Sequence, residues 1–116
     1  MEYRIVIDFW FRDTPPSRWF AKNTDFDRLI RTRFQALHAA AARGELWAWR
    51  ALPEGRLAEI LVLDQFSRNI YRDSPLAFAQ DAAALVLAQE AVSASADRDF
   101  DPPRTEDDYV PRVGRT

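Results

Sequence analysis

The stretch GRLAEILVLDQFSRNIYR, residues 55–72, decides the fold class because its apolar and polar residues recur with the period of an α-helix. Residues on one face of a helix recur every three or four positions. Such spacings relate Leu57, Ile60, Leu61, Asp64 and Arg68. Pro53 suits the first position of such a helix, since the amide that proline lacks would have no partner there. We therefore predict a helix from Pro53 to about Ile70.

A second helical pattern precedes this stretch and runs from Asp25 to about Arg43. Its apolar residues, again at spacings that fit one helix face, are Phe26, Leu29, Ile30, Phe34 and Leu37. We expect Thr24 or Asp25 to cap its first turn. Gly44 then offers the left-handed residue that ends many helices.

An alanine-rich stretch after residue 72 predicts a further helix. Ser74 can act as its cap and Pro75 as its first residue, which places the helix from Leu76 to about Val92. Because short connections favour antiparallel neighbours, residues 53–95 are predicted to form a helical hairpin.

The two ends of the chain are less regular. Tyr3 to Phe11 is compatible with a strand or with a short buried helix, and local pattern leaves both open. Beyond residue 96 the chain is rich in proline, acids and arginine. We predict a helical domain at residues 1–95 and an irregular or disordered tail at 96–116.

Composition excludes several classes of function. The 116 residues include no cysteine and one histidine, which excludes a disulfide framework, a thiol nucleophile and a multi-histidine metal centre. The net charge of −2 argues against a nucleic-acid partner. The first residues lack the charge pattern of a secretory signal and no apolar stretch is long enough to span a membrane, so we expect a cytoplasmic protein without a membrane partner.

The densest polar group in the chain is Asp64-Gln65-Phe66-Ser67-Arg68-Asn69. On a helix, Asp64 can pair with Arg68 and Gln65 with Asn69, because residues four apart are neighbours. Arginine, asparagine and glutamine could together orient a carboxylate, a phosphate or a peptide backbone. The same residues could instead bond two helices to each other, and that structural interpretation is favoured.

Four sequence segments resemble one family of bacterial proteins of unknown function, DUF924. They are IVIDFWF at 5–11, WFAK at 19–22, LHAAAARGELWAW at 37–49, and LVLDQFSRNIYR with AFAQDAAALVLA at 61–88. The resemblance implies an all-α fold of stacked antiparallel helices, tetratricopeptide-like, and a helical conformation for Tyr3 to Phe11. Family members usually continue through a segment resembling LFLYLPFMHSE, which is absent here. The resemblance therefore implies an incomplete helical array in a truncated or frameshifted relative.

An incomplete array has a physical consequence for the alanine-rich helix. In stacked-helix folds each hairpin is covered by the next, so we expect an apolar face near Leu85, Val86 and Leu87 to be left exposed. A homo-oligomer formed through such exposed apolar helix faces is the expected result.

Other chemistry-bearing residues are assigned structural roles. His38 has no serine or second histidine near it in the sequence, so no catalytic triad can be named. The four tryptophans are predicted to be mainly core anchors. They are Trp10, Trp19, Trp47 and Trp49.

The function favoured by the sequence is a non-catalytic helical module that binds a protein or peptide. Its groove is expected near Trp10 and the polar strip, with binding residues Trp10, Asp64, Gln65, Arg68, Asn69 and Arg72. The alternative is an enzyme or binding protein for a small anionic metabolite, with Arg68 and Arg72 orienting the anion. No catalytic residue, metal ligand or cofactor is assigned.

Overall fold

The computed structural model describes residues 2–96, and these residues form helices without any strand. The α-helices are α1 (Tyr3–Ile7), α2 (Thr24–Ala42), α3 (Pro53–Leu61), α4 (Ser67–Ile70) and α5 (Asp81–Ala96). Short 3-10 helices lie at Pro16–Arg18, Trp47–Ala51 and Pro75–Phe78, and π-helical segments at Asp8–Asp13 and Val62–Phe66. The predicted all-α fold is confirmed, and the ambiguous N-terminal stretch is helical. The tail predicted for residues 96–116 lies almost wholly outside the described residues.

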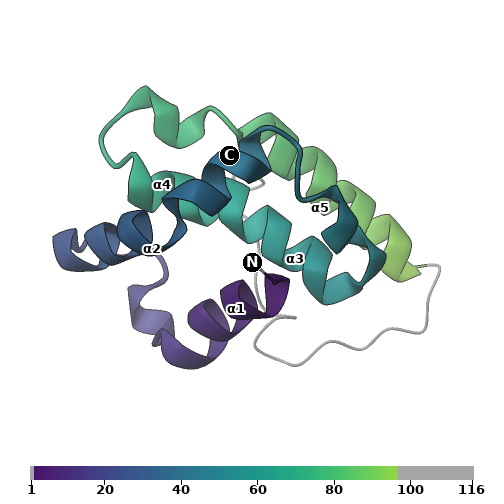
Figure 1. Cartoon of the computed structure of the whole chain (residues 1–116), viewed down its shortest axis with the longest axis horizontal. Helices are drawn as coiled ribbons and strands as arrows, with labels where there is room; N and C mark the ends of the chain where they lie inside the picture. Colours follow the sequence, from purple (N-terminus) through teal and green to yellow (C-terminus); the bar gives the residue numbers. More distant parts are fainter. Residues whose placement is uncertain (1, 97–116) are drawn as a thin grey trace.

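One continuous helical segment forms the centre of the molecule. It consists of α3, the π-helical segment and α4, and α1, α2 and α5 lie around it (Figure 1). Pro53 occupies its first turn, as predicted, and Ile70 is its last residue. Helix α5 returns beside α3 in the opposite direction, so residues 53–95 form the expected hairpin.

The ends of α2 depend on one side chain and one glycine. The cap is Asn23, whose side-chain oxygen accepts a hydrogen bond of 2.9 Å from the Phe26 amide, so the predicted caps Thr24 and Asp25 are wrong by one or two residues. Asn23 can cap because its backbone is extended while both predicted caps already have helical backbone. Gly44 has a φ of 76°, the left-handed conformation expected after the helix.

The segment between α4 and α5 differs from the predicted helix at Leu76–Val92. Ser74 does cap, but it precedes a 3-10 turn, and α5 begins only at Asp81 and continues to Ala96. The Ala77 carbonyl accepts a hydrogen bond from Arg68 at 3.2 Å, and Asp81 also binds Arg68. These contacts hold both residues against the central helix, which explains why the chain turns here instead of starting a regular helix.

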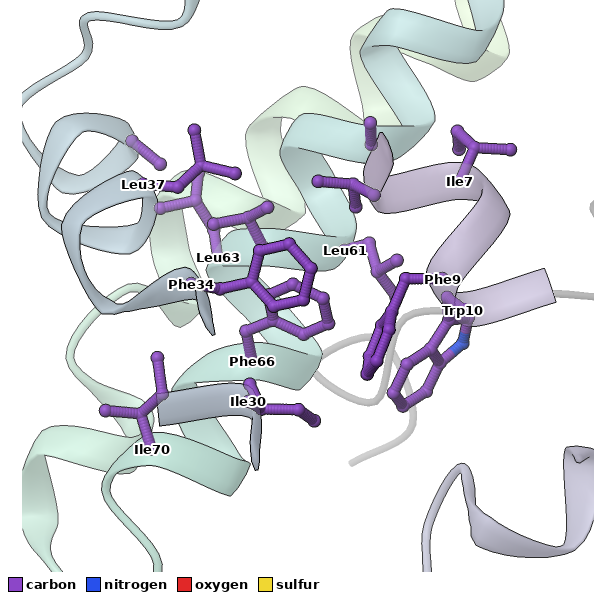
Figure 2. Packing of buried hydrophobic residues seen from close by; sticks show 14 of the residues in the cluster. Ile7, Phe9, Trp10, Ile30, Phe34, Leu37, Leu61, Leu63, Phe66 and Ile70 are labelled. Atoms are coloured by element: carbon purple, nitrogen blue, oxygen red, sulfur yellow. The ribbon is translucent and has the colours of Figure 1, made fainter. Parts of the chain in front are cut away.

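Aromatic side chains form most of the core between α2, the central helix and the N-terminal helical segment. The rings of Phe34 and Phe66 lie 4.8 Å apart between their centroids, and Phe9 meets Phe34 edge-on at 5.0 Å (Figure 2). Trp10 contacts Phe66 at 5.9 Å and has no exposed surface. The N-terminal residues therefore belong to the same core as the rest of the described chain.

The tryptophans do not all serve as core anchors. Trp10 is fully buried, Trp19 stacks on Trp10 at 6.1 Å, and Trp49 is half-buried against Tyr3. Trp47, by contrast, is 67% exposed. It lies in the 3-10 turn between α2 and α3, where only one side of the turn faces the core.

Candidate functional site

The polar strip lies inside the protein. Every residue from Ala58 to Ile70 is buried, including Asp64, Gln65, Arg68 and Asn69. Asp64 and Gln65 belong to the π-helical segment, a type of helical turn that is rare and often found at functional sites. Because the central helix is surrounded by its neighbours, the strip mainly bonds helices to one another, and only Arg68 and Asn69 reach the edge of a surface cleft.

Arg68 is held by contacts from several parts of the chain. Its guanidinium donates two hydrogen bonds to Asp81, at 3.0 and 3.3 Å, and two more to the carbonyls of Asp64 and Ala77. The predicted Asp64 pair is present as an ion pair of 3.6 Å. The Phe78 ring lies 5.0 Å from the guanidinium carbon. Arg68 thus ties the start of α5 to α4, and all four of these hydrogen bonds come from its two terminal nitrogens, Nη1 and Nη2.

A second chain of contacts links the strip to α2. Gln65 donates to Asn69 at 3.1 Å, the predicted pair, and Asn69 donates to Asp27 at 2.8 Å. Arg72 binds the two carboxylate oxygens of Asp27 at 2.8 and 2.9 Å. The pKa of Arg72 is raised, and the largest cause is this hydrogen bonding to Asp27. This chain of contacts leads from the interior toward the surface and ends at the partly buried Arg72.

His38 has a partner that sequence reasoning missed. Its Nε2 lies 2.7 Å from Ser67 Oγ, and Ser67 also bonds the Leu63 carbonyl at 2.6 Å. The two residues are 29 positions apart, so the expectation of no serine near His38 is wrong in three dimensions. Burial lowers the pKa of His38 below its usual 6.5, which favours the neutral ring. Both side chains are buried, so the pair has a packing role.

A further ion pair that sequence reasoning missed joins the 3-10 turn after α2 to α3. Arg50 binds both oxygens of the fully buried Glu59, at 2.8 and 2.9 Å. The pKa of Arg50 is raised chiefly by this hydrogen bond. The sequence signal for this pair is Glu59, which lies on the apolar side of a helix. A carboxylate buried there needs a cation as its partner.

Trp10 lies apart from any surface site. The Trp19 indole donates to the Trp10 carbonyl at 3.0 Å, and the Trp10 ring is enclosed by other aromatic rings. A ligand could contact it only if the core opened. Of the six predicted binding residues, Arg68 and Arg72 line surface clefts, and so does the edge of the buried Asn69.

Two clefts meet at Arg72. One has a volume of about 580 Å³ and extends from Arg68 along the turn to Phe78. The other, of about 280 Å³, lies between the start of α2 and the end of α4. It is lined by Lys22, Thr24, Asp27, Arg28, Arg31, Asn69, Arg72 and Asp73.

Metal and membrane chemistry can be assessed for the same residues. Among residues 2–96, no three histidine or acidic side chains come together in a way that could hold a metal ion. In that part of the chain no helix has the length and apolar character needed to cross a membrane.

Comparison with known proteins agrees with this fold. No curated protein matches the chain. A solved structure described as a protein of unknown function, ATU0120 from Agrobacterium tumefaciens, is 37% identical and has a TM-score of 0.77. The similarity covers 85% of the present chain and 56% of the Agrobacterium chain, so this protein spans little more than half of that relative's length.

A family description supplies the second comparison. The sequence model for bacterial proteins of unknown function, DUF924, matches residues 6–112. The match continues beyond residue 88, where the last of the resembling segments ends. With most of its length matched, the chain belongs to the DUF924 family of bacterial proteins.

Proposed function

We propose that the protein is a non-catalytic helical interaction module that forms a homodimer through the outer face of α5. The observation that supports this proposal is the apolar character of that face. Leu85, Val86 and Val92 are 37%, 52% and 70% exposed on a helix that has few charged residues anywhere on its circumference. A helix that is apolar on all sides is normally buried on all sides.

The exposed residues of α5 form one continuous arc. Successive residues of an α-helix are about 100° apart, so residues that share the solvent side cover about half the circumference. The members of this arc are Ala82, Ala83, Leu85, Val86, Gln89, Glu90, Val92 and Ser93, and Ser95 near the end of the helix is exposed beside it. Glu90 is the one charged residue among them. The opposite side of α5, which includes the fully buried Ala84, packs on α3 and the π-helical segment.

The outer side of α2 provides a contrast within the same molecule. Its exposed residues include Arg28, Arg31 and Arg33 together with Gln35. A face with several charged and polar residues is ordinary for a helix on the surface of a protein. The unusual face of α5 is therefore a local property of that helix.

The position of Glu90 favours a second copy in the antiparallel orientation. A two-fold interface must be complementary to itself. If the axis passes between residues 87 and 88, Glu90 of one copy lies opposite Leu85 of the other, and Ala82 lies opposite Ser93. The two Glu90 residues are then about 7.5 Å apart along the helix axis, whereas a parallel pair would place them directly across from each other.

This proposal replaces the groove expected near Trp10, because Trp10 is buried and α5 is exposed. It fits the tetratricopeptide-like arrangement that the resemblance implies, in which each hairpin is covered by another. A cytoplasmic location is part of the proposal, and a chain without cysteine is compatible with it. The enzyme alternative has less support, since Asp64 is buried and both terminal nitrogens of Arg68 already bind Asp81.

The test is the mass of the protein in solution for the full chain and two matched variants. Val86→Glu places a charge in the proposed interface, and Leu29→Glu makes the same change on α2 at a side chain of similar exposure, 49% against 52%. We expect a dimer that dissociates on dilution for the wild type and Leu29→Glu, and a monomer for Val86→Glu. Light scattering should cover about 1 µM to 1 mM, which corresponds to association free energies of about 8 to 4 kcal/mol.

Circular dichroism provides the control for folding, because both substituted side chains are half-exposed and their replacement should leave helix content unchanged. A wild-type protein that stays monomeric over this concentration range would refute the proposal. So would a dimer that both variants weaken equally, because the interface would then not involve α5.

A further inference from the structure

The cleft between the start of α2 and the end of α4 collects positive charge. Four cationic side chains line it, Lys22, Arg28, Arg31 and Arg72, against the two acids Asp27 and Asp73. The whole protein carries a net charge of −2, so this surplus of two positive charges is local. Unlike the face of α5, the cleft is hollow and polar.

Both acids in the cleft are already engaged by the protein. Asp27 accepts hydrogen bonds from Asn69 and, twice, from Arg72. Asp73 pairs with Lys22 at 3.2 Å. Their carboxylates therefore position cations and offer little to a bound cation of their own.

Two of the arginines are held in place before any ligand arrives. Asp27 binds Nε and Nη2 of Arg72, and within residues 2–96 the third nitrogen, Nη1, has no hydrogen-bond partner. Arg31 donates through one terminal nitrogen to the carbonyl of Ile70, at the end of α4. Fixed arginine side chains lose little conformational entropy when they bind an anion.

Arg28 supplies a cation with no internal role. It is exposed on α2, and it makes no hydrogen bond or ion pair with any other residue of the described chain. Its charge therefore remains available to a ligand in the cleft. Because Arg28 supports no other contact, it can be replaced without disturbing the fold.

We infer that this cleft binds a small ligand through a dianionic phosphate group, with Arg72 and Arg31 as fixed donors and Arg28 completing the charge. The surplus of two positive charges equals the charge of such a group, and arginine guanidinium groups bind phosphate oxygens in pairs. The volume of about 280 Å³ is at the small end of ligand pockets, which limits the ligand to a phosphate with a small organic body. Two surplus charges are too few for a nucleic-acid backbone.

This inference differs from the anion site suggested by the sequence. There Arg68 and Arg72 act together, but Nη1 and Nη2 of Arg68 already donate to Asp81 and two carbonyls. The partners of Arg72 in the cleft come from α2 instead. Gln65 and Asn69 contribute indirectly to this cleft. Gln65 bonds Asn69, and Asn69 helps to hold the Asp27 carboxylate that orients Arg72.

The test is calorimetric titration of the full chain with inorganic phosphate and, separately, with glycerol 3-phosphate, at low ionic strength and pH 7.5. Arg28→Gln and Arg31→Gln remove cations of the cleft. Arg12→Gln is the charge-matched control, because Arg12 is exposed and lies outside the cleft. We expect saturable binding that each cleft variant weakens by about threefold to tenfold, while the control leaves it within about twofold.

The two probes distinguish the source of the phosphate. Tighter binding of glycerol 3-phosphate indicates a phosphate ester as the ligand, and equal or tighter binding of inorganic phosphate indicates the free ion. Both results support a phosphate site. The inference is overturned if neither probe shows saturable binding up to about 10 mM, or if Arg12→Gln weakens binding as much as Arg28→Gln, which would indicate unspecific attraction.

Discussion

Replacing Asn69 with alanine tests whether the polar strip stabilises the fold. The side chain of Asn69 is 1% exposed, donates to Asp27 at 2.8 Å and accepts from Gln65 at 3.1 Å. The bond to a carboxylate is worth about 1.5–3 kcal/mol and the neutral bond about 0.5–1.5 kcal/mol. Asp27 keeps Arg72 as a partner and is in part solvated, so the loss of the bond between Asn69 and Asp27 should cost an amount at the lower end of the range for a carboxylate. We expect the variant to lower the free energy of unfolding by about 2–3 kcal/mol.

A large part of this cost falls on Gln65. Its Oε1 is buried without a hydrogen-bond partner among the described residues, and the variant removes the partner of its Nε2 as well. Urea denaturation followed by circular dichroism measures the change, with Gln35→Ala on the exposed side of α2 as a control that should stay within about 0.5 kcal/mol of wild type. An Asn69→Ala protein as stable as this control would refute the structural interpretation and favour a ligand-binding role for the strip.

Three further predictions concern other buried contacts. Arg50→Met should lower the free energy of unfolding by about 2–3 kcal/mol, less than the ~3–5 kcal/mol usual for breaking a buried ion pair, because the Arg50 side chain is 35% exposed. Adding Glu59→Met should recover much of that loss. A double variant that is less stable in urea than the single variant would contradict this. Gly55→Ala should destabilise the protein by about 1–3 kcal/mol despite the better helix propensity of alanine, because the added Cβ would collide with the Trp49 carbonyl. A raised melting temperature of the variant would count against this prediction. Burial lowers the pKa of His38, so the unfolded chain binds a proton more readily than the folded chain, and the free energy of unfolding should fall as pH drops below 6.5 toward the lower folded pKa. The urea midpoint should therefore fall more for wild type than for His38→Gln between about pH 7.5 and 5.5. Equal falls for the two proteins would argue against the buried neutral ring.

Local sequence patterns predicted most of the helices because the signals that form a helix lie within a few residues of one another. The central helix begins at Pro53 and ends at Ile70, as expected, and Gly44 closes α2. The errors lie at helix ends. Several polar residues near the start of α2 could cap it, and the choice of Asn23 depends on where the backbone changes from extended to helical.

The start of α5 shows a different limit. The alanine-rich pattern gave no reason to delay the helix from residue 76 to residue 81. The delay accompanies the contacts of Ala77 and Asp81 with Arg68, which comes from the preceding helix. Tertiary contacts can shift a helix boundary because a few residues of propensity are worth less than one ion pair with a buried arginine.

The sequence by itself determined the class of fold and the pairs that stand four residues apart, Asp64 with Arg68 and Gln65 with Asn69, because the helical repeat places such residues next to each other. The tertiary structure alone decided the partners that are distant in the chain. These are Asp81 for Arg68, Asp27 for Asn69 and Arg72, and Ser67 for His38. It also decided that the strip is buried except where Arg68 and Asn69 reach the edges of the clefts, while one side of α5 and the Arg72 cleft face the solvent. The physical reason is that a helical period specifies which residues share a face, whereas the neighbour of that face depends on how whole helices pack.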